Sequence, residues 1–136
     1  MTEPLSPVLV LAVDDDVLVL DLLQSALEDG GFQVKTALGG DEAIAALEMN
    51  RARDICAVVT DVNLGRGTNG WDVGQRAREL SPGLPVLYIS GDSAHDWTSR
   101  GVPRSLLVQK PFAPAQIVTA VASLINQQIA APDGHS

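Results

Sequence analysis

The stretch Val8-Leu-Val-Leu-Ala-Val-Asp-Asp-Asp16 is an uninterrupted apolar run that ends in three consecutive acids. A short run rich in valine and leucine is typical of a strand buried on both faces. The segment that follows has the spacing of one buried helical face, which we expect to comprise Val19, Leu22, Leu23, Ala26 and Leu27. Gly30-Gly31 then predicts the end of that helix.

The same alternation of apolar runs and amphipathic segments continues along the chain. Further strands are expected at Phe32–Ala37, Ile55–Thr60, Pro85–Ile89 and Arg104–Val108. Helices are expected near 40–50 and 70–80, with a short one near 93–99. A last helix would bury Ile117, Val118, Val121, Leu124 and Ile125. Because consecutive parallel strands need helical crossovers, the pattern predicts an α/β domain with a doubly wound, five-stranded parallel sheet.

Composition limits the class of protein. The 136 residues are 46% hydrophobic, which suits one folded domain. We expect an N-terminal extension at 1–7, the domain at 8–128 and a flexible tail at 129–136. The net charge of −8 disfavours direct nucleic-acid binding. The sequence shows no long apolar run for a membrane span, no secretory signal and a single cysteine, Cys56, so we expect a cytoplasmic protein.

Polar residues follow four of the five predicted strands. They are Asp14 and Asp15 after the first strand, Asp61 after the third, Ser90 after the fourth and Lys110 after the fifth. The second strand ends in Leu38-Gly39-Gly40, without a reactive group. Ligands of open parallel sheets bind at the carboxyl ends of the strands, near the point where the strand order reverses. A strand order of 2-1-3-4-5 explains the pattern, because it puts the second strand at an outer edge.

This set of residues predicts phosphoryl-transfer chemistry. Converging carboxylates repel one another, and a hard divalent cation such as Mg²⁺ offsets that repulsion. The Lys110 amine and the Ser90 hydroxyl would bind the charged oxygens of a phosphoryl group. Asp61, alone at the end of a central strand, is the natural nucleophile.

Four segments, in order and at suitable spacing, resemble the receiver domains of two-component response regulators. The segments are Leu11–Asp16, Val58–Asn63, Tyr88–Gly91 and Gln109–Phe112, and the likeness runs from about residue 7 to 127. The resemblance implies a flavodoxin-like (βα)5 fold and a signalling switch that catalyses its own phosphorylation and slow dephosphorylation. It does not imply a turnover enzyme.

The resemblance also assigns roles to single residues. Asp61 would take a phosphoryl group from a phosphohistidine on a histidine kinase or phosphotransfer protein. Asp15 would bind Mg²⁺ directly, Asp14 through water, and the backbone carbonyl of Asn63 would complete the metal site with Asp61. Ser90 would swing to the phosphoryl group and Lys110 would pair with it, aimed by a cis Lys110–Pro111 bond.

The chain departs from the family pattern in three places. Leu107 occupies the position, three before the lysine, that is usually Tyr or Phe, so the family's aromatic switch cannot operate there unchanged. The loop over residues 63–70 is slightly long and lacks the common proline. The region of the fourth helix is about two residues shorter than in the family pattern.

Less specific interpretations remain open for several residues. The acids at 14–16 suit a helix N-terminus, and Asp16 in particular could be only a cap. Asp61 and Lys110 could form a structural salt bridge, and Ser90 could merely begin a turn. Cys56 is expected to be a packed small residue, the glycines at 65, 67 and 70 to form a flexible rim, and Trp71 and Trp97 could be surface contacts or partly buried.

Function outside the site rests on expectations about partners. Val17, Leu18 and Leu20 lie off the predicted core face and could dock the phosphodonor, unless the helix simply has a wide buried face. The main hypothesis is a stand-alone receiver, monomeric or weakly dimeric, that binds a protein target or relays phosphate. A receiver piece of a hybrid histidine kinase is a close variant. A haloacid-dehalogenase-type phosphohydrolase, which would normally have a second Asp where Asn63 stands, and a phosphorylation-independent interaction module are the alternatives.

Overall fold

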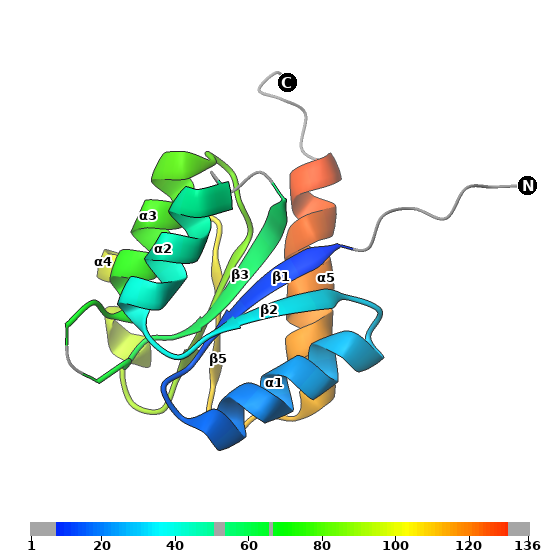
Figure 1. The fold of residues 1–136 in the computed structure, drawn as a ribbon, viewed down its shortest axis with the longest axis horizontal. Helices are drawn as coiled ribbons and strands as arrows, with labels where there is room; N and C mark the ends of the chain where they lie inside the picture. The colour runs from blue at the N-terminus through cyan, green and yellow to red at the C-terminus, as the bar shows by residue number, and fades with distance from the viewer. Residues whose placement is uncertain (1–7, 51–53, 66, 131–136) are drawn as a thin grey trace, which may run out of the picture.

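The computed structural model describes residues 8–50, 54–65 and 67–130 of the chain. Its centre is a five-stranded parallel sheet with the order β2-β1-β3-β4-β5, as predicted (Figure 1). The strands are β1 (Leu9–Val13), β2 (Gln33–Ala37), β3 (Ile55–Asp61), β4 (Val86–Ser90) and β5 (Leu106–Gln109). Each strand begins and ends within two residues of the bounds that the sequence predicted.

Helices connect successive strands. They are α1 (Val17–Asp29), α2 (Gly40–Asn50), α3 (Gly70–Leu80), a 3-10 turn η1 (Ala94–Asp96), α4 (Trp97–Arg100) and α5 (Pro114–Ala130). The short helix expected near 93–99 is therefore η1 followed by α4. Helix α5 continues two residues beyond the domain boundary expected at 128, and residues 131–136 lie outside the described part. Within residues 8–50, 54–65 and 67–130, no helix has the length and apolar character needed to cross a membrane.

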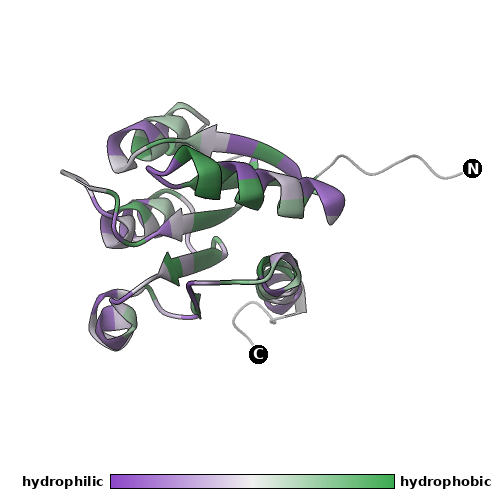
Figure 2. Cartoon of the chain, turned by 90° about the horizontal axis from the view of Figure 1, so that it is seen from below, coloured by the Kyte–Doolittle hydropathy of each residue, from purple (hydrophilic) through white to green (hydrophobic). Residues whose placement is uncertain are grey.

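The helices cover the sheet in two layers. Helices α1 and α5 lie on one face, while α2 and α3 lie on the other (Figure 1). Strand residues alternate between the layers, so Val10 and Ala12 pack toward α1 and α5, and Leu11 and Val13 toward α2 and α3. In Figure 2 the inner strands are mostly green, while the edge strand β2 and the helices carry both colours, as expected for elements with one buried face.

The buried face of α1 differs from the predicted one. Leu20, which we placed off the core face, is only 6% exposed, whereas Leu22, which we placed on it, is 57% exposed. Leu23, Ala26 and Leu27 are buried as predicted. Positions 17–20, 22 and 23 are all apolar, so spacing alone does not fix the rotation of the first turns of the helix. Packing against both the sheet and α5 decides it.

Helix α3 packs closely on β4. Trp71 is 2% exposed, and its ring centroid lies 4.7 Å from that of Tyr88. A Cβ atom built on Gly74 would overlap the Tyr88 hydroxyl, so glycine is required for this approach. At the end of the same helix, Arg78 donates hydrogen bonds to backbone carbonyls in the segments before β4 and β5, among them Leu84 O at 2.6 Å. Trp71 is thus a core residue and not a surface contact.

Candidate phosphoacceptor site

The parallel strands bring the predicted residues to one edge of the sheet. Asp14 directly follows β1, Asp61 ends β3, Ser90 ends β4 and Lys110 directly follows β5. The strand register aligns these ends, since Asp61 pairs with Ile89 and Ser90 with Gln109. Asp14, Asp61 and Ser90 are each at most 4% exposed. The arrangement expected from the strand order is therefore present.

Three carboxylates crowd this edge. Asp14, Asp15 and Asp61 each offer an oxygen atom, and these atoms lie within 4.8 Å of one another. Asp14 Oδ1 accepts a hydrogen bond from the backbone N–H of Asp16 at 2.9 Å. Asp14 Oδ2 is buried and accepts no hydrogen bond from the described residues. An unsatisfied buried carboxylate oxygen is costly and favours a cation in the same place.

Lys110 is the cation that faces these acids. Its Nζ atom donates to Asp61 Oδ2 at 3.2 Å and lies 3.6 Å from Asp14 Oδ2. The other Asp61 oxygen, Oδ1, accepts from the backbone N–H of Asn63 at 3.3 Å. The salt bridge between Asp61 and Lys110 thus exists, but it leaves an acid-rich site around it. The peptide bond between Lys110 and Pro111 is cis, as the resemblance implied.

Burial governs the ionisation of the site. Burial, reinforced by the Asp61 and Asp15 charges, raises the pKa of Asp14 to about 6. Burial also raises the pKa of Asp61, against the opposing effect of the Lys110 charge. For Lys110, burial alone would lower the pKa, but the charges of Asp61 and Asp14 raise it overall, so the amine stays protonated.

The donor set fits a hard divalent cation. Carboxylate and carbonyl oxygens are the ligands that Mg²⁺ prefers, and one of the buried oxygens lacks a hydrogen-bond donor. An open hollow beside Asp61 is lined by Asp15, Asn63, Gly65, Gly91, Asp92 and Lys110. A Cβ atom on Gly65, whose φ is 79°, would lie 3.3 Å from Asp15 Oδ2, so this glycine contributes to the free space.

Two of the less specific interpretations describe real contacts. Asp16 caps α1, because its side chain accepts from the backbone N–H of Leu18 at 2.9 Å. Ser90 also begins a turn, since its Oγ accepts from the backbone N–H of Ser93 at 2.6 Å. Ser90 nevertheless ends β4 at the acid-lined edge, so the turn and the proposed phosphoryl contact use the same hydroxyl.

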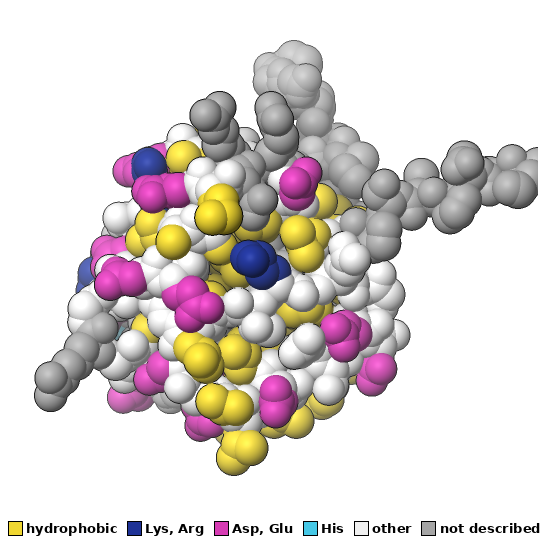
Figure 3. Space-filling view, in the orientation of Figure 1, with side chains coloured by type: hydrophobic (Ala, Val, Ile, Leu, Met, Phe, Trp, Pro, Cys, Tyr) yellow, Lys and Arg dark blue, Asp and Glu magenta, His cyan; other side chains and the backbone are white. Residues whose placement is uncertain are grey.

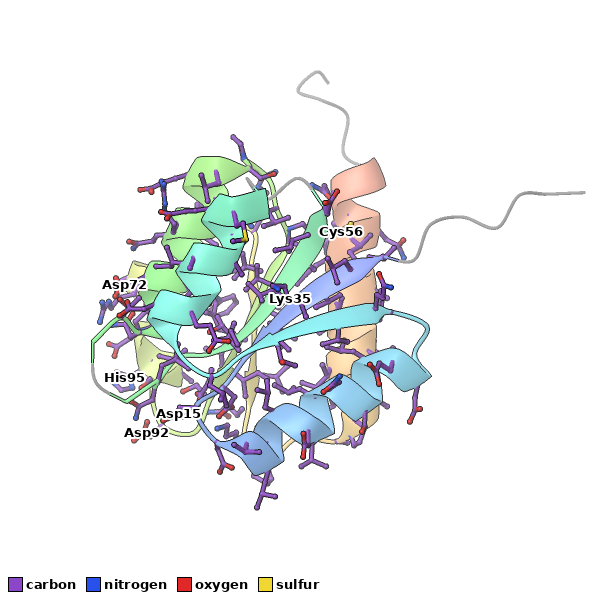
Figure 4. The ribbon with its side chains drawn as sticks, viewed as in Figure 1. Asp15, Lys35, Cys56, Asp72, Asp92 and His95 are labelled. Carbon is purple, nitrogen blue, oxygen red and sulfur yellow. The ribbon has the colours of Figure 1, made fainter. Side chains whose placement is uncertain are left out.

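Asp92 was not among the residues that sequence reasoning selected. It lines the hollow, and Figure 4 shows it on the same side of the molecule as Asp15, in the segment between β4 and η1. The available signal was its place two residues after Ser90, at the carboxyl end of a predicted strand. His95, labelled in the same region, lies outside the carboxylate cluster.

Comparison with known proteins identifies the family. The sequence model of the response regulator receiver domain matches residues 10–122. A crystal structure of a response regulator receiver protein from Sinorhizobium medicae is 42% identical, with a TM-score of 0.83, and the match covers 90% of this chain and 97% of that one. The receiver domain of NtrX from Brucella abortus is 29% identical, with a TM-score of 0.74 and coverages of 86% and 98%.

A curated relative extends beyond the matched region. The probable transcriptional regulatory protein TcrX of Mycobacterium tuberculosis is 34% identical over 123 residues, which are 89% of this chain and 51% of the relative. The chain thus spans about half the length of the curated relatives it matches. With its fold, its acid-lined strand ends and its family match, the chain belongs to the response regulator receiver domains, which are signalling switches of two-component systems rather than turnover enzymes.

Proposed function

We propose that this chain is a phosphorylation switch in which Asp61 accepts a phosphoryl group from a phosphohistidine, with Mg²⁺ as cofactor. The observation that carries the proposal is the buried Asp61 carboxylate between two other acids and the Lys110 amine. Its position at the open hollow lets a donor approach. In the transfer, the phosphorus–nitrogen bond of the donor breaks, its electron pair stays on the histidine nitrogen, and a bond forms from phosphorus to an Asp61 oxygen.

In this proposal the acidic residues of the site bind the metal ion, and Lys110 and Ser90 bind the phosphoryl group. Asp14, Asp15, Asp61 and the backbone carbonyl of Asn63 would hold Mg²⁺, which when bound offsets the negative charge of the acids and of the phosphoryl oxygens. Lys110, which now pairs with Asp61 Oδ2, can transfer its hydrogen bond to a phosphoryl oxygen. Ser90 offers a hydroxyl donor from the neighbouring strand end, and Gly91 leaves the approach open.

The exposed apolar side of α1 is the proposed docking surface for the phosphodonor. Val17, Leu18 and Leu22 are 56%, 74% and 57% exposed. The first of them, Val17, lies two residues after Asp15, so this surface begins close to the site. Figure 3 shows hydrophobic side chains gathered over this lower part of the molecule. Leu20, expected on this surface, is buried, and Leu22 takes its place. A helical phosphodonor would lay an apolar face of its own against this surface.

The same hypothesis says how the protein would pass on its signal. Phosphorylation of Asp61 would shift the domain between two conformations, and one of them would bind a protein target or pass the phosphoryl group on. We propose that the protein acts in the cytoplasm, without direct contact to nucleic acid. It would be a monomer or a weak homodimer, either on its own or as the receiver piece of a longer kinase.

The deciding experiment locates the phosphoryl group. The protein is incubated with phosphoramidate and Mg²⁺, and intact-mass and peptide mass spectrometry find the modified residue. We expect one phosphoryl group on Asp61, dependent on Mg²⁺ and absent from Asp61→Asn, which keeps its fold because the change removes a crowded charge at nearly constant volume. A phosphoryl group on another residue contradicts the proposal. Multiple turnover of small phosphate esters would favour a hydrolase, and no modification would favour a phosphorylation-independent module.

A further inference from the structure

Trp97 offers an aromatic side chain where β5 lacks one. Leu107 occupies the position of the family's usual switching aromatic, and Trp97, the first residue of α4, packs partly buried against the same hydrophobic cluster as Leu107. The Trp97 indole N–H donates to Ser105 Oγ at 2.9 Å, and Ser105 is 7% exposed. A Cβ atom on Gly101 would overlap the indole ring, so glycine at the end of α4 makes room for this position.

A short series of hydrogen bonds connects Trp97 to the phosphoacceptor site. Ser90 Oγ accepts from the backbone N–H of Ser93 at 2.6 Å. The carbonyl of Ser93 in turn accepts from the backbone N–H of Asp96 at 3.0 Å. Asp96 directly precedes Trp97. The hydroxyl that would contact a phosphoryl group therefore also fixes the start of the segment that carries the indole.

The far side of Trp97 is tied to β4 as well. Ser105 donates from its hydroxyl to the carbonyl of Val102 at 2.6 Å. The backbone N–H of Val102 donates to the buried Tyr88 hydroxyl oxygen at 3.1 Å. Tyr88 lies two residues before Ser90 and pairs in register with Leu107. Hydrogen bonds therefore connect the Trp97 segment to β4 on both sides, through Ser90 and through Tyr88.

This segment has little stability of its own. Helix α4 has four residues and η1 has three, too few for a helix to persist without tertiary contacts. Its position depends on Ser90, Ser105 and the packing of the indole. If Ser90 rotates to donate to a phosphoryl oxygen, its Oγ leaves the Ser93 N–H, and one of these three supports is lost.

We propose that Trp97 is the switching aromatic of this receiver. Its indole is held by Ser105 before phosphorylation and leaves Ser105 when Ser90 turns to the phosphoryl group on Asp61. The inference rests on the proposed phosphorylation of Asp61. Release of the indole changes the surface of α4 and the adjoining hollow at Gly101, Pro103 and Arg104. That surface is where a protein target distinguishes the two states.

Fluorine NMR on the full chain tests this directly. Trp71 and Trp97 are the two tryptophans, so 5-fluorotryptophan labelling gives two resonances, assigned with Trp97→Phe. Beryllofluoride with Mg²⁺ serves as the phosphoryl mimic, and its own fluorine signal reports a filled site. We expect the Trp97 resonance to shift in proportion to the filled fraction of the site. The indole should also become more accessible, so that a soluble paramagnetic agent broadens its resonance more. In Ser90→Ala, filled at higher beryllofluoride concentration, the Trp97 resonance should stay in place. A Trp97 resonance that does not move in the filled wild type overturns the inference.

A second measurement separates switching from mere packing. Ser105→Ala removes the acceptor of the indole N–H, so the released state becomes more populated and beryllofluoride should bind about fivefold more tightly, the equivalent of one ordinary hydrogen bond. Trp97→Phe, which removes the donor, should act in the same direction. Ser99→Ala is the matched control, because Ser99 is an exposed serine of α4 that donates to the Asp96 carbonyl on its own segment.

The outcomes distinguish this inference from the proposed function. Unchanged beryllofluoride affinity in both Ser105→Ala and Trp97→Phe overturns the role of Trp97, while phosphorylation of Asp61 stands. An equal gain in Ser99→Ala also overturns it, because the effect would then be general to α4. A wild-type protein that neither binds beryllofluoride nor takes up a phosphoryl group at Asp61 overturns both.

Discussion

Asp14 is buried, and the effect of burial on its pKa has a consequence for stability. The pKa is about 6 in the folded protein and 3.8 ordinarily, because of burial. Between about pH 4 and 6 the folded protein therefore binds more protons than the unfolded chain, so stability falls as pH rises through this range. We predict that the metal-free protein gains roughly 1–3 kcal/mol of unfolding free energy when the pH is lowered from about 7 to about 5. Urea unfolding in the presence of a chelator measures it.

The control for this prediction is Asp14→Asn. The amide cannot ionise, so the variant should be more stable than the wild type at neutral pH without metal and should show a flatter pH profile. The raised pKa of Asp61 acts in the same direction, which leaves a smaller residual slope. A wild type that loses stability as the pH falls toward 5, or a variant with an unchanged slope, would show that Asp14 does not dominate the site.

The sequence predicts the location of those site residues that lie at the end of a strand. Asp14, Asp61 and Ser90 follow β-strand patterns directly, so the fold class alone places them at one edge. Asp92 could not be assigned in this way, because its position depends on the path of the turn after Ser90, which the Ser93 hydrogen bond sets. Asp14 Oδ2 accepts no hydrogen bond from the described residues, and this too is a property of three-dimensional packing.

At the scale of elements, α1 should act as the recognition helix for the phosphodonor. We predict that Leu18→Ser combined with Leu22→Ser slows transfer from a phosphorylated histidine protein by about tenfold or more, because exposed apolar anchors carry much of such an interface. Loading by phosphoramidate, which needs no docking surface, should be unchanged. The measurement is the rate of transfer from whichever phosphohistidine protein labels the wild type fastest. Equal rates in variant and wild type would exclude this surface.

The packing of α3 on β4 makes a second prediction at this scale. Gly74→Ala places a methyl group on the Tyr88 hydroxyl and should destabilise the fold by roughly 1–3 kcal/mol through overpacking. Tyr88→Phe removes that hydroxyl and the hydrogen bond from Val102. The double variant should therefore lose less stability than the sum of the two single losses, as measured by urea unfolding. Strict additivity would show that the two side chains do not compete for the same space.

Elements were predictable in kind and approximate extent, but not in every orientation. Alternation of apolar runs and helical patterns predicted five strands and the short fourth helix, and the polar residues that follow four of the strands predicted the strand order. The predicted rotation of α1 was wrong at Leu20 and Leu22, because the apolar residues of its first turns do not define a single face and packing against the sheet and α5 selects the buried one. The contacts of Arg78 with backbone carbonyls near β5 also join segments far apart in sequence, which no local pattern reveals.

For the whole molecule, we predict that Mg²⁺ stabilises the fold through the charge of the acids that the fold brings together. The net charge is −8, and three of the acids are drawn together by the fold alone, so the unfolded chain has no comparable site. A ligand that binds only the folded state adds about 2.7 kcal/mol when present at roughly 100 times its Kd. We predict a rise in Tm with Mg²⁺ that exceeds the effect of NaCl at equal ionic strength and that is largely lost in Asp15→Asn, where an exposed ligand is removed without disturbing the core. Thermal unfolding followed by circular dichroism measures this. If NaCl matches Mg²⁺, or if Asp15→Asn responds like the wild type, general screening of the negative surface accounts for the effect and the three acids do not form a metal site.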